Sequence, residues 1–267
     1  MLEVTRFTLL TIVRMRAWQM LCALVLAAPV LSWVFGAFFM VDIAKVHRDL
    51  FVAVAMAGGL AYVLLIVLPL FASDMEGGAL PVLAPPMRRR SFLLGRFFGA
   101  VGALGMYLLC AGVGAAALTL SDIALLDPYY REGTSLGFAF LLPPALFYQL
   151  TTLVAAMLAI ASFASGRVEA SVFGLGFLVL VWAVPAALAV LTNPEVAAQT
   201  PLWLQRMLAL VAWLFPLVST GDVLLALTRG LEGIVSFRAV AAHLGAHLAY
   251  TAAMLILGLR WFERRPL

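Results

Sequence analysis

Long runs of apolar residues, separated by short breaks rich in charged or turn-forming residues, occupy most of the chain. A helix that crosses a membrane needs roughly 20 predominantly apolar residues, and six of the runs reach that length. The predicted spans cover residues 18–41, 50–72, 97–120, 136–164, 170–191 and 242–261. The pattern therefore predicts an all-α polytopic membrane protein with six transmembrane helices, forming a single transmembrane domain over residues 1–267.

A further apolar stretch, residues 202–227, is long enough to cross the membrane but is interrupted by Arg206, Pro216 and Asp222. A charged side chain at membrane depth is unfavourable, and proline breaks or kinks a helix. The alternatives are a seventh, kinked span and a pair of short re-entrant helices that dip in from the outer side and are broken near Pro216. The interruptions favour the re-entrant pair.

The segment before the first span, residues 1–16, is predicted to form an interfacial helix. It carries Arg6, Arg14 and Arg16, which can face anionic headgroups at a membrane surface. Alternatively, these arginines only fix the orientation of the first span. The apolar run that follows is longer than the about 7–15 residues of a signal-peptide core, so the first span is expected to be retained.

The composition agrees with a membrane location. Hydrophobic residues make up 65% of the chain, charged residues 11%, and the mean hydropathy is +1.09. Soluble domains contain about 25% charged residues, so a water-facing surface cannot be built from this inventory, and disorder is excluded as well. The two cysteines, Cys22 and Cys110, are too few for a disulfide scaffold.

The charges also predict an orientation. Six spans place residues 1–16, residues 73–96, the turn around Arg167 and the C-terminal end on one side of the membrane. That side holds 11 of the 17 basic residues and 5 of the 13 acidic ones. By the positive-inside rule it is the cytoplasmic side, so both termini are expected in the cytoplasm. A seventh span would send the C-terminal arginines outside, against this rule.

Residues for chemistry inside the membrane are scarce. The chain has no phosphate-binding loop of the Gly-x4-Gly-Lys-Ser/Thr kind, and the middles of the predicted spans lack acidic and basic residues. Gln149, Thr151 and Thr152 in the fourth span are expected to hydrogen-bond between helices. The chain is therefore not expected to be an enzyme by itself or to bind a cofactor.

A histidine pair in the sixth predicted span is a candidate metal site. His243 and His247 lie four residues apart, hence on one face of the sixth span, and such spacing can supply two ligands. A third ligand is absent nearby in sequence, and Asp222 or Glu232 could supply one only if the preceding loop folds back. Hydrogen bonding of these interfacial histidines to backbone or water is the favoured role, and metal binding is the alternative.

Small residues open the third span. Gly95, Gly99, Gly102 and Gly105 include a Gly-x3-Gly pair, and small residues let helix backbones approach closely in membranes. Close packing within the bundle is the favoured interpretation, and a dimer contact is the alternative.

The strongest local signal is the segment between the second and third spans, residues 73–96. It runs from two acidic residues through glycines and a short apolar patch to prolines, and ends in an arginine triplet and Leu-Leu-Gly-Arg. Leu80, Val82 and Leu83 could enter a groove on a partner, while Arg88, Arg89 and Arg90 could meet acidic groups of that partner or lipid phosphates. An ordinary positive-inside loop is the alternative.

This segment resembles the first cytoplasmic loop of the type-2 ABC exporter permeases. That loop reads acidic, Gly-Thr-Leu, two apolar residues, a proline, an arginine three positions on, then Leu-Gly-Lys. Ala79 replaces the usual threonine, and Pro81 sits where a short coupling helix would run. The residues that match are Glu76, Gly78, Leu80, Leu83, Pro86, Arg89, Leu94, Gly95 and Arg96. The predicted interfacial helix, six spans and outer re-entrant helices are also similar to the family layout.

The resemblance implies a function and partners. It implies a permease subunit in a bacterial inner membrane, paired with a second copy or a homologue and working with two separate ATP-hydrolysing subunits. ATP and Mg²⁺ would bind those subunits, and the segment from Glu76 to Arg96, with Arg88 and Arg90, would transmit their movement to the spans. The alternatives are a non-ABC carrier or assembly factor, and an intramembrane lipid-modifying enzyme.

Overall fold

The computed structural model describes residues 1–39, 42–78, 88–131, 134–191, 200–214 and 237–264, and every regular element within them is helical. This confirms the all-α prediction. The elements are α1 (Leu2–Arg14), α2 (Arg16–Gly36), α3 (Ile43–Tyr62), α4 (Leu68–Ser73), α6 (Arg89–Leu125), α7 (Gly137–Phe163), α8 (Arg167–Leu191), α10 (Leu202–Leu214) and α12 (Phe237–Arg264), with π-helical turns η1 (Val63–Val67) and η2 (Asp74–Gly78) and a 3-10 turn η3 (Pro128–Arg131).

Within the described residues, four helical rods are long and apolar enough to cross a membrane. They run over Arg16–Gly36, Ile43–Glu76, Arg89–Leu125 and Gly137–Phe163, and they contain most of the first four predicted spans. The second rod joins α3, η1, α4 and η2 without interruption. The remaining two predicted spans coincide with α8, of 25 residues, and α12, of 28 residues.

The helices extend beyond the apolar runs from which they were predicted. The α6 helix begins at Arg89 and ends at Leu125, whereas its apolar run covers residues 97–120. Arginine and leucine are good helix formers, and a helix need not end where its apolar stretch ends. As a result, the predicted loop of residues 73–96 consists mostly of two helix ends, η2 and the first turns of α6.

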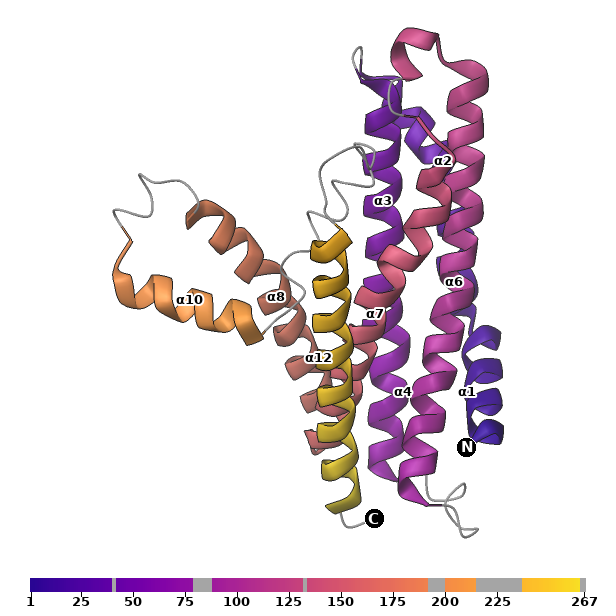
Figure 1. The fold of residues 1–267 in the computed structure, drawn as a ribbon. Coiled ribbons are helices and arrows are strands. Elements are labelled where there is room, and N and C mark those ends of the chain that lie inside the picture. The colour runs from indigo at the N-terminus through magenta and orange to yellow at the C-terminus, as the bar shows by residue number, and fades with distance from the viewer. Residues whose placement is uncertain (40–41, 79–87, 132–133, 192–199, 215–236, 265–267) are drawn as a thin grey trace.

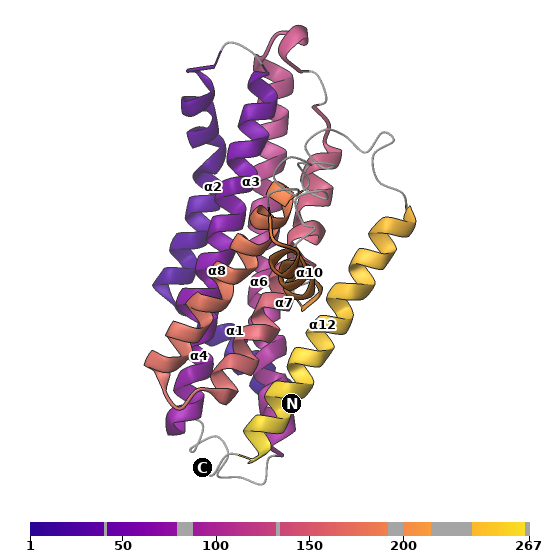
Figure 2. The ribbon, with the colours of Figure 1, turned by 90° about the vertical axis from the view of Figure 1, so that its left-hand side faces the viewer.

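The long helices form an upright bundle, with α12 leaning against α7 and the pair of α8 and α10 projecting to one side (Figures 1 and 2). The α7 helix packs against α6, α12, α4 and α8, and most of its side chains are buried. Two tyrosines lock α3 to α6 reciprocally: Tyr62 donates to the carbonyl of Ala100 at 2.7 Å, and Tyr107 donates to that of Ala55 at 2.8 Å.

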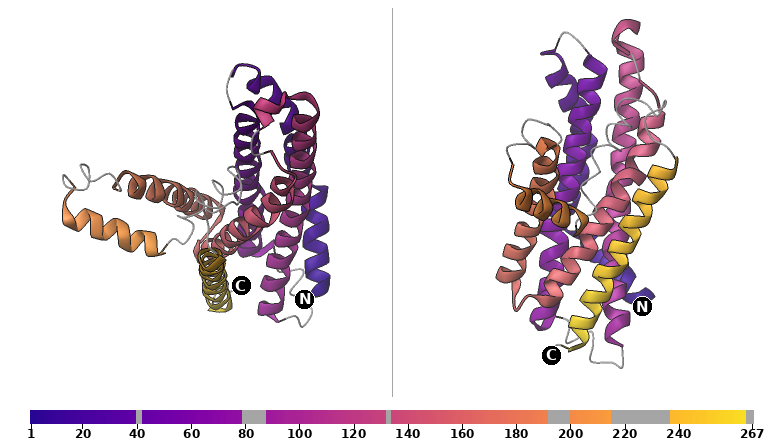
Figure 3. Two further views of the ribbon diagram at one scale, coloured as in Figure 1. Left: turned by 45° about the horizontal axis from the view of Figure 1, so that its top comes forward. Right: turned by 60° about the vertical axis from the view of Figure 1, so that its left-hand side comes forward.

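The predicted interfacial segment is the helix α1. It lies beside the end of α6 that carries the arginine cluster (Figures 1 and 3). Val4, Thr8 and Ile12, spaced four residues apart, form its buried face, because residues four apart lie on one side of a helix. The side chains of the three predicted headgroup ligands are exposed: Arg6, Arg14 and Arg16.

The predicted re-entrant pair is described only in its first half. The helix α10 covers Leu202–Leu214. The predicted break near Pro216 and the second helix up to residue 227 lie outside the described residues.

Candidate functional site

Five segments that are distant in sequence converge at one end of the bundle, which we call the arginine-rich end. It comprises α1, η2 with the end of α4, the first turns of α6, the junction between α7 and α8, and the last turn of α12. The start of α1, the end of α12 and the described parts of the segment predicted to couple to a partner are located there (Figure 1). The convergence agrees with the side assigned to these segments from their charge.

A buried ion pair lies at the centre of this end. The Arg96 guanidinium donates to the Asp74 carboxylate at 2.6 Å and to the Thr8 hydroxyl at 3.3 Å. The side chains of Arg96 and Asp74 are 7% and 5% exposed. The Arg96 guanidinium also lies 5.8 Å and 5.4 Å from the ring centroids of Phe7 and Phe92, within range of a cation–π interaction. One side chain thus joins α1, η2 and α6.

An exposed ion pair connects η2 to the start of α8. Glu76 accepts from the backbone N–H of Arg167 at 2.7 Å and from its side-chain Nε at 2.7 Å. The same guanidinium donates to the Ser73 hydroxyl at 3.0 Å. A carboxylate at this position also meets the positive end of the α8 dipole. Glu76 therefore caps α8 as well as pairing with its first residue.

The arginine triplet connects α6 to α12. Arg89 donates to the backbone carbonyl of Glu263 at 3.2 Å, where α12 has carbonyls with no partner in the helix. Arg90 pairs with the Glu263 carboxylate in a two-pronged contact. That hydrogen bond to Arg90 lowers the pKa of the Glu263 carboxyl below its usual value. Phe92 stacks on Phe262 with ring centroids 6.2 Å apart.

These contacts change the role assigned to the triplet. Arg89 and Arg90 were expected to face a partner or lipid phosphates, but both bind the end of α12. Arg88 is exposed and forms no ion pair with any residue that the structure describes. It is the member of the triplet that remains open to a partner.

The helix α1 packs against Gly95 and Gly99 of α6. A side-chain Cβ at Gly95 would come within 2.8 Å of the Val4 Cβ, and one at Gly99 within 2.5 Å of the Thr8 Cβ. Both glycines thus serve packing inside the bundle, as expected, and α1 covers the face that a dimer contact would have used. At Gly102 and Gly105 the nearest atoms lie at 3.5 Å and 3.8 Å, which is ordinary contact.

The sequence identified only half of each ionic contact. Glu76, Arg89, Arg90 and Arg96 were singled out, but their partners Asp74, Arg167 and Glu263 were recognised only as charged residues at span ends. The one available signal was that each partner also stands at a span end assigned to the same side. Of the other predicted coupling residues, Gly78 ends η2, while Leu80, Leu83 and Pro86 lie outside the described residues.

A polar contact between α7 and α12 shows how His247 is bonded. The Thr152 hydroxyl lies 3.1 Å from Nδ1 of His247 and accepts from the Thr251 hydroxyl at 3.1 Å. The interhelical hydrogen bonding predicted for Thr152 is confirmed, whereas Gln149 and Thr151 make no hydrogen bond to another helix among the described residues. His247 was expected to bond to backbone or water at the interface, but its side chain is buried and bonds to Thr152, because α12 packs directly against α7. The side chain of His243 lies outside the described part of the chain, within which no cluster of three potential metal ligands occurs.

A second buried charge cluster lies at the opposite end of the bundle. Nδ1 of His47 is 2.8 Å from the Asp122 carboxylate, and both side chains are fully buried. Arg48 is buried beside them, and the Trp33 ring lies 4.8 Å from that of His47. The sequence placed these residues in water-facing breaks between spans, but α3 and α6 extend far enough to bring them together inside the bundle.

No protein-family model and no curated protein matches the chain.

Proposed function

We propose that this chain is the transmembrane permease subunit of an ABC-type exporter, driven by separate ATP-hydrolysing subunits that dock on residues 73–96. One observation carries the proposal: the two helix ends that flank residues 79–87 are joined by ion pairs and hydrogen bonds to α1, α8 and α12. A partner that moves this segment would act on three further helices. The resemblance of residues 76–96 to the coupling loop of type-2 ABC exporter permeases supplies the identity of that partner.

The proposed assembly contains two permease subunits and two ATPase subunits. In it α8 and α12 are the fifth and sixth spans, the arginine-rich end faces the cytoplasm, and the substrate path lies between the permeases. ATP and Mg²⁺ bind the ATPase subunits, and the permease has no catalytic role of its own.

The strengths of the contacts fit a coupling role. Coupling requires states that the nucleotide-bound partner binds differently. The exposed pairs Glu76–Arg167 and Arg90–Glu263 are screened by solvent, so exchanging them between states requires little free energy. The buried pair Asp74–Arg96 resists separation, because breaking it would leave a charge uncompensated in the bundle. The proposed movement therefore changes the outer contacts and retains the central pair.

The test is a charge reversal at the residue left open to the partner. The full chain is purified from its native membrane with its co-purifying ATPase, and ATP hydrolysis by the complex is measured. We expect Arg88→Glu to weaken ATPase association about ten-fold, because it places like charge against an acidic docking surface. It should not unfold the permease, since Arg88 has no ion pair with the described residues.

Arg206→Glu is the matched control, because Arg206 is exposed on α10, far along the chain from the arginine-rich end. Unchanged association in Arg88→Glu would remove the docking role from this segment. Purification without any protein that carries a phosphate-binding loop would overturn the proposed function as a whole.

The buried cluster of His47, Arg48 and Asp122 favours one second candidate, a proton-coupled carrier. Ionisable residues inside membrane bundles mark proton paths in pumps and transporters. In liposomes that contain only this chain, a carrier would move protons in response to a pH gradient, and Asp122→Asn would stop that movement. The proposed permease would show no proton movement without its ATPase.

A further inference from the structure

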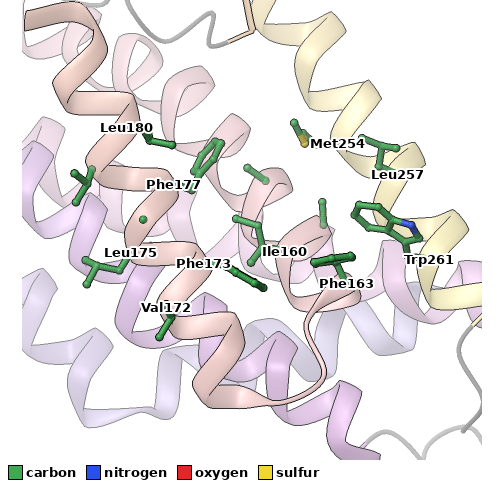
Figure 4. Close-up of a pocket in the computed structure, with 14 residues that line it drawn as sticks. Ile160, Phe163, Val172, Phe173, Leu175, Phe177, Leu180, Met254, Leu257 and Trp261 are labelled. Carbon is green, nitrogen blue, oxygen red and sulfur yellow. The ribbon is translucent and has the colours of Figure 1, made fainter. Parts of the chain in front are cut away.

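An apolar groove lies between α7, α8 and α12 near the arginine-rich end. Its volume is about 890 Å³, within the range of about 300–1,000 Å³ typical of ligand pockets. Figure 4 shows side chains from all three helices surrounding it, including Ile160 from α7, Phe173 from α8 and Met254 from α12. Every lining residue is apolar, so the groove suits a hydrocarbon chain.

Small residues give the groove its depth. Ala156 and Ala159 line it on α7 and Gly176 on α8. A side-chain Cβ built at Gly176 would meet no atom within 4 Å. The space is therefore vacant around the backbone of α8, and a larger side chain there would fill it without a clash.

A smaller cavity with polar lining residues, which we call the mouth, adjoins the groove. Its volume is about 340 Å³, and it is lined by Ser162, Phe163, Ser165, Trp261 and Arg264. Phe163 and Trp261 line both cavities, and their ring centroids are 4.9 Å apart. Tryptophan is enriched where the membrane meets water, so this aromatic pair marks the boundary between an apolar chain and a polar headgroup.

The charge at the mouth is positive. Arg264 forms no ion pair with any residue that the structure describes. Glu263, which precedes Arg264, is engaged with Arg90, and Glu169, four residues from Ser165, is engaged with the backbone N–H and hydroxyl of Ser165. Arg264 thus offers an unopposed guanidinium at the end of an apolar groove.

We propose that this groove binds one anionic phospholipid, with an acyl chain between α8 and α12 and its phosphate at Arg264. A ligand that fits this site needs a long apolar part for the groove and an anionic group for Arg264, and it must lie at the membrane surface. An anionic lipid of the cytoplasmic leaflet meets all three conditions. A second protein copy would not place negative charge at Arg264 specifically. Lipid binding in this groove would not require an ATPase partner, so it is a property separate from the proposed export function.

Tryptophan fluorescence tests the proposal. The full chain is placed in phosphatidylcholine nanodiscs with phosphatidylglycerol brominated on its acyl chains, which quenches tryptophans that it touches. The signal of Trp261 is the component removed by Trp261→Phe, and bromine on the acyl chain reports a lipid rather than a free phosphate ion. We expect brominated phosphatidylglycerol to quench this component at an about five-fold lower fraction than brominated phosphatidylcholine.

Two variants distinguish the contribution of the apolar groove to lipid binding from that of the Arg264 charge. Gly176→Leu fills the groove and should remove quenching by both lipids. Gly245→Leu is its matched control, because a Cβ there also meets nothing within 4 Å but lies outside the groove. Arg264→Gln should abolish the preference for phosphatidylglycerol and retain quenching. Equal quenching by the two lipids in the unmodified chain, or full quenching in a folded Gly176→Leu variant, would overturn the proposal.

Discussion

At the scale of single residues, the buried pair of Arg96 and Asp74 determines how the arginine-rich end is built. Its hydrogen bond to Thr8 and its contacts with two aromatic rings support the charge where water is excluded. A buried ion pair is not in itself a source of stability, because desolvation offsets the attraction. We expect its value here to be specificity, since the guanidinium contacts α1, η2 and its own helix α6 at the same time.

Removing one partner should therefore be costly. Asp74→Asn is expected to reduce the free energy of unfolding by about 3–5 kcal/mol, because it leaves the Arg96 charge unpaired inside the bundle. Glu76→Gln should lose less than about 1 kcal/mol, because its pair with Arg167 is exposed. Thermal unfolding in detergent measures both, and a similar loss in the two variants would contradict the central role of Asp74–Arg96.

At the scale of elements, the sequence predicted helices well and their ends poorly. Apolar run length located the first four long helices, because the membrane requires that length. The runs missed the charged extensions of α3 and α6, since a helix can carry Arg96 or Asp122 inside a bundle once a partner pairs with it. Those partners come from other helices, and nothing local in the sequence specifies which charges will meet.

The close packing of α1 against Gly99 of α6 can be tested by substitution. Gly99→Ala should destabilise the protein by about 1–3 kcal/mol, because the added methyl overlaps Thr8 and the backbone carbonyl of Thr5. Gly102→Ala, three residues away, meets Leu9 at ordinary distance. It should be neutral or slightly stabilising, since alanine favours the helix over glycine. Protease cleavage between α1 and α2 reports loosening of α1, and equal cleavage of both variants would argue against this packing.

At the scale of the whole molecule, α7 holds the other helices together and α12 is fixed at two points. Along its length α12 is attached to α7 through His247 and Thr152, and at its end to α6 through Glu263 and Arg90. The side-by-side arrangement of α7 and α12 was not predictable from the apolar pattern. The predicted span in α7 is apolar around most of its circumference, so no stripe on it indicates a neighbour. The α12 helix does carry polar residues at helical spacing, including His247 and Thr251, but they do not specify which helix they meet.

The groove between α8 and α12 should widen when its ionic attachments are cut. In a chain with Cys22 and Cys110 replaced by alanine, spin labels are placed at Val168 on α8 and Ile256 on α12, both exposed. We expect combined Arg90→Gln and Arg167→Gln to broaden the distance distribution between the labels. Arg206→Gln is the control, and an unchanged distribution in the double variant would show that packing alone fixes the groove.

The two ionic attachments have a mechanical consequence. Glu76 holds α8 from one end of residues 79–87, and Arg89 and Arg90 hold α12 from the other end. The two walls of the groove are thus attached to two neighbouring helix ends, η2 and the start of α6. A displacement of these two helix ends would move both walls at once, so we expect the width of the groove to report displacement at the arginine-rich end.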